Sequence, residues 1–208
     1  MIDNKIKKLT LLKGTRFLSL YDATYENKKG NEKHWIIASR KDYITLKRQY
    51  FEVEVEDENK VMVDAVVIAA LHKESNKLVL IKQFRVPLND YVYELPAGLI
   101  DNNEKIDIAA VRELKEETGL SLIEINHGKS KDKVFLSVGM TDESVALVYC
   151  TCKGVISNEY LEDDENIETI LVSQVEAKEL LKTNIKMDIK VFMLLTSFVE
   201  LGEKLFIG

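Results

Sequence analysis

The chain has 208 residues, and its 29 Lys and Arg against 35 Asp and Glu give a net charge of −6. This length can bury a proper core, in one domain or in one domain with a small appendage. No basic block stands out, which argues against nucleic acid or an anionic membrane as the main partner. The longest apolar run, residues 65–71, is too short to span a bilayer. The first residues lack the apolar stretch of a secretion signal, so we expect a cytoplasmic protein.

The first sixty residues are rich in β-forming side chains. Strands are predicted at residues 16–25 and 34–39, with a turn at 28–31 between them. Residues 51–56 alternate Phe or Val with Glu, which is typical of a half-buried strand. We therefore expect a strand-rich N-terminal region.

A polar segment at residues 57–60 interrupts this pattern, and we place a boundary there, between an N-terminal extension, 1–58, and a main domain, 59–208. In the main domain, strands are interspersed with helices, which indicates a mixed α/β fold with helices packed on a sheet. The acidic run at 159–165 is predicted to be a solvated loop. The predicted strands cover residues 61–71, 78–84, 91–94, 122–126, 134–137, 145–153 and 167–172, and the predicted helices cover 101–118, 175–182 and 187–201.

The predicted helix at 101–118 has clear start and stop signals. Asp101 or Asn102 can cap its first turn, and Glu104 stands three residues after Asp101, as a capping box requires. Gly119 suits the left-handed residue that commonly ends a helix. A helix is therefore expected to fill the interval between these signals.

Three glutamates crowd the last turns of this helix. Glu113, Glu116 and Glu117 are separated by three and four residues, so their carboxylates lie on neighbouring faces. Like charges at this spacing repel one another, and acids near a helix C-terminus also oppose the macrodipole. A hard cation such as Mg²⁺ would compensate for both effects. The alternative is a solvated acidic face that Lys105, Arg112 and Lys115 screen, and this interpretation is preferred for an isolated cluster.

The glutamates belong to a longer frame, which changes that preference. The spacing G-x5-E-x7-R-E-L-x-E-E-x-G-L resembles the Nudix box, the signature of hydrolases that act on nucleoside diphosphates linked to another group. The resemblance implies the Nudix α/β/α sandwich with a mixed sheet, extended here by strand-rich N-terminal residues. The match has no gap or substitution and comprises Gly98, Glu104, Arg112, Glu113, Leu114, Glu116, Glu117, Gly119 and Leu120.

The resemblance implies roles for these residues. Mg²⁺, or Mn²⁺, which accepts the same oxygen ligands, would be held by the three helix glutamates and the Ala97 carbonyl. Pro96 and Gly98 favour a turn that can aim a carbonyl at such an ion, although a turn with no ligand role remains an alternative. Arg112 and Glu104 would orient the metal ligands through an ion pair.

Two segments outside the box narrow the resemblance to ADP-ribose and related nucleoside-diphosphate-sugar pyrophosphatases. The first comprises residues 83–85 and 94–98, on the approach to the box. The second comprises residues 137–143, which resemble the S-P-G-x-[ST]-x-E loop of that group, except that Val138 replaces the proline. The loop makes Glu143 the candidate general base or an extra metal contact, against the alternative of a surface acid.

Substrate contacts are also expected from this comparison. Arg85 is a candidate for bidentate binding of a phosphate, and a structural salt bridge to Glu94 is nearly as favoured. Gly98 would let the backbone approach the substrate. Trp35 could stack on a nucleobase, although a lone Trp in a strand is more often packed into the core.

The expected reaction is divalent-metal-dependent hydrolysis of a pyrophosphate bond, with ADP-ribose yielding AMP and ribose 5-phosphate. The alternatives are another nucleotide sugar, a dinucleoside polyphosphate, a flavin dinucleotide or an oxidised nucleoside triphosphate. A non-catalytic Nudix module that senses a nucleotide is a further alternative. The resemblance also implies a homodimer that forms through the N-terminal region.

Overall fold

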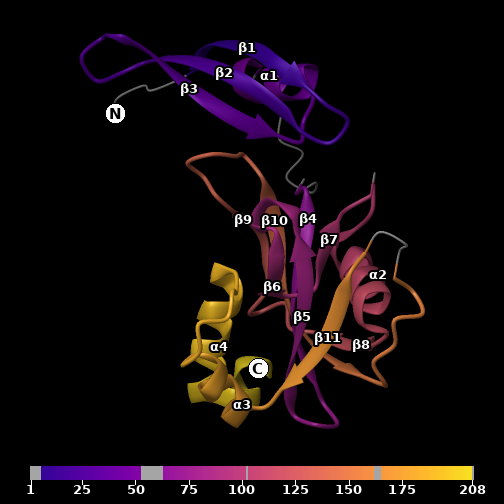
Figure 1. Cartoon of the computed structure of the whole chain (residues 1–208). Helices are drawn as coiled ribbons and strands as arrows, with labels where there is room; N and C mark the ends of the chain where they lie inside the picture. Colours follow the sequence, from indigo (N-terminus) through magenta and orange to yellow (C-terminus); the bar gives the residue numbers. More distant parts are fainter. Residues whose placement is uncertain (1–5, 53–62, 102, 162–164, 208) are drawn as a thin grey trace. The chain divides into compact units, whose positions relative to one another are not determined.

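The computed structural model describes residues 6–52, 63–101, 103–161 and 165–207 (Figure 1). These residues form two compact units. The N-terminal unit contains the described residues up to Asp64 together with Val134–Ser144, and the main unit contains the rest. The boundary predicted near residue 58 lies outside the described residues.

The N-terminal unit is a three-stranded antiparallel sheet with one helix packed on it. The predicted strands near residues 16–25 and 34–39 are confirmed, and a further strand precedes them. The core between the sheet and the helix consists of Leu9, Tyr21, Ala23 and Leu46. The elements are β1 (Ile6–Gly14), β2 (Ser19–Glu26), β3 (Glu32–Ser39) and α1 (Tyr43–Phe51).

Helix α1 was not predicted, and the strand expected to begin at residue 51 is wrong at its start. Phe51 is the last residue of α1, while residues 53–56 lie outside the described part. The signal that was missed is Asp42, whose carboxylate accepts a hydrogen bond from the Thr45 N–H at 2.7 Å and caps the helix. The burial of Leu46 against the sheet then offsets the entropy that is lost when the helix forms.

The main unit confirms the predicted α/β fold with a mixed sheet. The strand order is β11-β5-β4-β10-β8, with β6 paired to β5, β7 to β4 and β9 to β10. Strands β4 and β10 are parallel, and the pairs β10–β8, β11–β5, β4–β5, β4–β7 and β5–β6 are antiparallel. The strands are β4 (Ala65–His72), β5 (Lys77–Arg85), β6 (Asp90–Glu94), β7 (Ala97–Leu99), β8 (Ser121–Ile125), β9 (Lys131–Phe135), β10 (Ser144–Lys153) and β11 (Ile167–Val172).

Helices cover both faces of this sheet. Figure 1 shows α2 (Ile106–Thr118) on one side of the sheet, with α3 (Gln174–Leu180) and α4 (Ile189–Leu201) on the other. All eight residues of β4 are buried, as expected of a near-continuous apolar strand at the centre of a covered sheet. No helix in the described part of the chain is long and apolar enough to cross a membrane.

Helix α2 begins at Ile106, so the start predicted at Asp101 is wrong. The residues before it form a separate turn, in which the Glu104 N–H donates to the Asp101 carbonyl at 3.0 Å. Asn103 has a φ of 64°, a left-handed conformation that an α-helix cannot include. Glu104 still accepts a hydrogen bond from the Asp101 N–H at 3.1 Å, as expected, but in the turn ahead of the helix. The expected end of the helix is confirmed, because Gly119 is left-handed with a φ of 73°.

The packing of α4 gives a stability prediction. Phe198 is fully buried, and its ring centroid lies 6.2 Å from that of Phe206. Phe198→Ala should lower the free energy of unfolding by about 3–5 kcal/mol, because it removes apolar contacts and leaves a cavity. Urea unfolding followed by circular dichroism measures this loss. Phe192→Ala on the same helix is the control, since that ring is 49% exposed and should cost on the order of 1 kcal/mol or less. Equal losses in the two variants would contradict this account of the core.

Candidate active site

The Arg112 side chain joins three carboxylates, one from the turn before α2 and two from the C-terminal half of the helix. Its Nε and Nη2 atoms donate to the two oxygens of Glu104 at 2.9 and 2.8 Å. Its Nη1 atom donates to Glu113 at 2.6 Å and to Glu116 at 3.0 Å. The Glu104 hydrogen bonds raise the pKa of the guanidinium above its already high value, so it stays charged. The orienting role expected of Arg112 and Glu104 therefore has a direct geometric basis.

Arg112 also connects α2 to strand β7. Its Nη2 atom donates to the Leu99 carbonyl at 3.0 Å, at the end of β7. Strand β7 pairs with β4 through Gly98 and its neighbours, in a segment where the sequence predicts only a turn. The strand was not predicted because Pro96 and Gly98 are turn-forming residues and the strand has only three residues.

Glu117 is the most deeply buried of the box glutamates, at 3% exposed. One of its oxygens accepts a hydrogen bond from the Ala97 N–H at 2.9 Å. Burial raises the pKa of the Glu117 carboxyl to about 8, and this hydrogen bond only partly opposes the shift. Burial likewise raises the pKa of Glu113, although Arg112 opposes it. Both acids therefore lie where a bound cation would favour their charged forms.

Gly98 lies directly against the box helix. A Cβ atom at this position would stand 1.9 Å from the carboxyl carbon of Glu113. No side chain fits there unless the carboxylate moves. The structure thus brings Ala97 and Gly98 of β7 together with Glu113 and Glu117 of α2.

The donor atoms at this end of α2 suit a hard divalent cation. Within residues 6–52, 63–101, 103–161 and 165–207, no three acidic, histidine or cysteine side chains form a ready metal-binding group. The Arg112 guanidinium instead holds Glu113 and Glu116. Carboxylate oxygens are nevertheless the ligands that Mg²⁺ prefers, and two of these acids are buried with raised pKa values. Glu113, Glu116, Glu117 and the Ala97 backbone are the groups that could hold such an ion.

Arg85 makes the salt bridge that was considered as the alternative to a phosphate contact. Its Nε and Nη2 atoms donate to the two oxygens of Glu94 at 2.6 and 2.8 Å. This pair raises the pKa of Arg85, and the charges of Glu117 and Asp188 add to the effect. The Arg85 side chain is still 44% exposed, so it is anchored by Glu94 without being enclosed.

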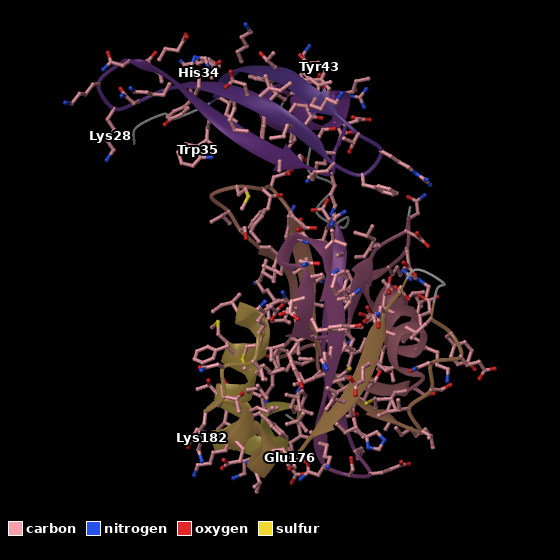
Figure 2. The ribbon with its side chains drawn as sticks, in the orientation of Figure 1. Lys28, His34, Trp35, Tyr43, Glu176 and Lys182 are labelled. Atoms are coloured by element: carbon pink, nitrogen blue, oxygen red, sulfur yellow. The ribbon has the colours of Figure 1, made fainter. Side chains whose placement is uncertain are left out.

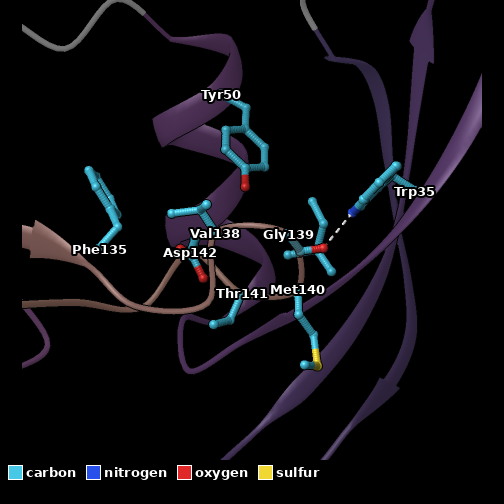
Figure 3. Close-up of a pocket in the computed structure, with 9 residues that line it drawn as sticks. Trp35, Tyr50, Phe135, Val138, Gly139, Met140, Thr141 and Asp142 are labelled. Atoms are coloured by element: carbon cyan, nitrogen blue, oxygen red, sulfur yellow. Dashed lines mark hydrogen bonds between the residues drawn. The ribbon is translucent and has the colours of Figure 1, made fainter. Parts of the chain in front are cut away.

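Glu143 and Trp35 belong to the N-terminal unit, and Figure 2 labels Trp35 there. Glu143 accepts a hydrogen bond from the Arg40 Nε atom at 2.7 Å. The Trp35 indole donates to the Gly139 carbonyl at 3.1 Å, and its side chain is half exposed. Trp35 is thus not packed into the core of this unit. It lines a pocket of about 330 Å³ whose other walls include Tyr50, Phe135, Val138 and Met140 (Figure 3).

Two charged residues were missed in the sequence. Glu165 was assigned to a solvated loop. Its negative charge nevertheless raises the pKa of both Glu113 and Glu117, so it acts electrostatically on the box glutamates. Residues 162–164 of that acidic run lie outside the described part. Arg40 was not singled out, because nothing in a basic residue after a strand indicates its partner 103 positions away.

The position of Gly98 makes a specific prediction. Gly98→Ala should weaken binding of Mn²⁺ by roughly 10–100-fold, because the new methyl group displaces the Glu113 carboxylate that Arg112 orients. Titration of Mn²⁺ by electron paramagnetic resonance measures this change. Gly128→Ala is a matched control, since its Cβ would meet no atom closer than 3.4 Å. Unchanged affinity in a folded Gly98→Ala variant would contradict the placement of Glu113 in a metal site.

The sequence is similar to those of known Nudix proteins. A putative nudix hydrolase 2 from Caenorhabditis elegans is 40% identical over 121 residues, which cover 53% of this chain and 52% of the relative. An ADP-ribose pyrophosphatase from Bacillus subtilis is 32% identical over 130 residues, covering 61% of this chain and 66% of the relative. The matched regions thus span about half to two thirds of these curated relatives.

The fold is also shared with a solved structure described as an ADP compounds hydrolase. The two chains superpose with a TM-score of 0.66 at 18% sequence identity, over 93% of this chain and 92% of the other. The family model of the NUDIX domain matches residues 62–193, which include the whole box and both segments that flank it. The chain therefore belongs to the Nudix family.

Proposed function

We propose that this protein is a pyrophosphohydrolase of nucleoside diphosphates linked to another group, with ADP-ribose as its first candidate substrate. The observation that carries the proposal is the complete Nudix frame, organised around Arg112 and its three carboxylates. Water would be added across one P–O–P bond, giving AMP and ribose 5-phosphate from ADP-ribose. The similarity to the Bacillus subtilis ADP-ribose pyrophosphatase supports this choice of substrate.

The reaction needs its anionic diphosphate neutralised and its water activated. Glu113, Glu116 and Glu117, with Ala97, would hold Mg²⁺ or Mn²⁺. The bound ion would polarise a phosphoryl oxygen and lower the pKa of a coordinated water. Arg112 keeps two of these carboxylates in place, which limits the reorganisation needed for catalysis.

The remaining site residues would act on the substrate. Arg85, held by Glu94, presents guanidinium N–H groups that suit a phosphate. Glu143 would accept a proton from the attacking water as the general base. Trp35 would stack on the nucleobase, and its half-exposed ring in a pocket wall supports this role. Gly98 keeps the backbone beside Glu113 free of a side chain.

A second candidate is the same chemistry on another nucleotide sugar. Val138 stands where the related loops carry proline, and its side chain is 76% exposed in the pocket that Trp35 also lines. A change at this position can alter the shape of the pocket. Dinucleoside polyphosphates, flavin dinucleotides and a purely nucleotide-sensing role receive no comparable support from these contacts.

A substrate panel tests the function directly. ADP-ribose, other nucleotide sugars, dinucleoside polyphosphates and flavin dinucleotides are incubated with Mg²⁺, and the products are identified by mass spectrometry. We expect equal amounts of AMP and ribose 5-phosphate from ADP-ribose. Calorimetric binding of ADP-ribose without release of any phosphomonoester, with Mg²⁺ or Mn²⁺, would instead indicate a sensor.

Glu117→Gln tests the metal ligands. It should lower kcat by roughly 100-fold or more, because the amide removes a charge from the metal site. The fold should survive, since the volume is kept and the Ala97 N–H retains an oxygen acceptor. Glu124→Gln, on the exposed side of β8, is the control and should leave kcat unchanged. Near-normal turnover of Glu117→Gln with Mg²⁺ would show that the metal assignment is wrong.

We also propose that the N-terminal sheet forms a homodimer. Leu20 and Ile36 lie on the face opposite Tyr21 and the core, and they are 41% and 49% exposed. Exposed apolar side chains on one face of a sheet suit association with a second copy. Light scattering should give twice the 23.8 kDa chain mass, and Ile36→Glu should give the monomer. A monomeric parent chain at micromolar concentration would contradict the proposal.

A further inference from the structure

The loop that carries Glu143 is attached to the end of β3 by the backbone. The Ala38 N–H donates to the Met140 carbonyl at 3.0 Å, and Ala38 and Thr141 form a parallel β-bridge. The Trp35 indole N–H donates to the preceding carbonyl of the loop, that of Gly139, as Figure 3 shows. Residues 137–144, which we call the acidic loop, are thus an extension of the N-terminal sheet in their hydrogen bonding.

Two consecutive basic residues after β3 then contact two consecutive acids of this loop. Arg40 Nε lies 2.7 Å from a carboxylate oxygen of Glu143. Lys41 Nζ lies 2.6 Å from Asp142. Arg40 and Glu143 keep the register of the β-bridge, each two residues beyond it, whereas the Lys41 side chain reaches back by two residues to Asp142. The position of Glu143 is therefore fixed from its own side chain and from its neighbour.

Asp64 closes the other end of the acidic loop. Its carboxylate lies 3.6 Å from Lys41 Nζ and accepts hydrogen bonds from the Ser144 N–H and hydroxyl at 2.8 and 3.1 Å. Its own N–H donates to the Ser144 carbonyl at 2.9 Å. Lys41 thus joins two acids, Asp64 and Asp142, whose side chains are only 15% and 11% exposed. Ion pairs shielded from water to this extent are screened less by salt than pairs on an open surface.

We propose that Arg40 and Lys41 are positioning residues for Glu143, so that the N-terminal extension determines where the candidate base lies. The inference rests on the proposed function, because it requires Glu143 to take part in hydrolysis. Arg40 engages one oxygen of the Glu143 carboxylate. The other oxygen has no hydrogen-bond donor in the described part of the chain, so it is available to accept a proton from water. Lys41 acts indirectly: it pairs with Asp142, which precedes Glu143, and with Asp64, which binds Ser144 at the end of the acidic loop.

A double-mutant cycle tests whether Arg40 acts through Glu143. Arg40→Gln, Glu143→Gln and the double variant are compared by steady-state hydrolysis of ADP-ribose with Mg²⁺. Arg40→Gln should lower kcat by about 10-fold or more with little change in KM, because a misplaced Glu143 carboxylate removes the proton of the attacking water less efficiently. In the Glu143→Gln background it should cause no further loss beyond about twofold. Arg40→Lys keeps the charge and should recover part of the loss.

The outcomes separate this inference from the proposed function. A large loss of kcat in Glu143→Gln supports its role as the base, whereas unchanged kcat removes that role and the inference with it. If Glu143→Gln does lose kcat, equal losses from Arg40→Gln in both backgrounds would overturn the positioning role. A rise in KM without a fall in kcat would overturn it too, and would make Arg40 a direct substrate contact.

Hydrogen–deuterium exchange tests Lys41 independently of activity. Lys41→Met keeps the aliphatic stem and removes the charge that joins Asp64 and Asp142. Amides of residues 137–144 should exchange about 10-fold faster, while those of α2 should not change. Lys182→Met is the matched control, because it removes an exposed pair with Glu179 and should leave the acidic loop unaltered. Unchanged exchange of the loop in a folded Lys41→Met variant would overturn the role of Lys41.

Discussion

The ion cluster around the Arg112 guanidinium is the interaction on which the candidate active site depends. One planar cation binds Glu104, Glu113 and Glu116 and also reaches the Leu99 carbonyl of β7. Such a cluster explains how a helix can carry acids at unfavourable spacings near its C-terminus. Without the guanidinium, the repulsion among these carboxylates would act between partly buried groups. Arg112 thereby connects three elements: the turn before α2, the helix itself and β7.

The fold could be predicted wherever one local pattern determined the structure. The buried run of β4 and the left-handed Gly119 both carry their signal within a few residues. Prediction failed where distant contacts decide. Strand β7 exists because β4 offers it a partner, and α1 is stable because Leu46 packs on the sheet. The start of α2 is a separate, local case. A turn with left-handed Asn103 uses Asp101 and Glu104, the residues that were expected to form the capping box of the helix.

The site residues that could be predicted from the sequence are those that belong to the spacing pattern of the box. Box residues stand within 23 positions of one another, so their spacing alone places them on one helix and its flanking loops. Arg85 illustrates the limit, because its two interpretations differ only in which anion it binds, and the structure gives it Glu94. Arg40 and Glu165 lie outside the frame, and their relation to the acids depends on packing across the chain.

The central claim is that the Arg112 cluster holds the ligands of a catalytic divalent cation. A crystal structure of the protein with Mn²⁺ and a non-hydrolysable analogue of ADP-ribose, with anomalous diffraction data, tests this most directly. The account predicts an anomalous peak coordinated by Glu113, Glu116 and Glu117, with a phosphate oxygen of the analogue in the same coordination sphere. A peak at other residues, or none in the presence of the bound analogue, would contradict it.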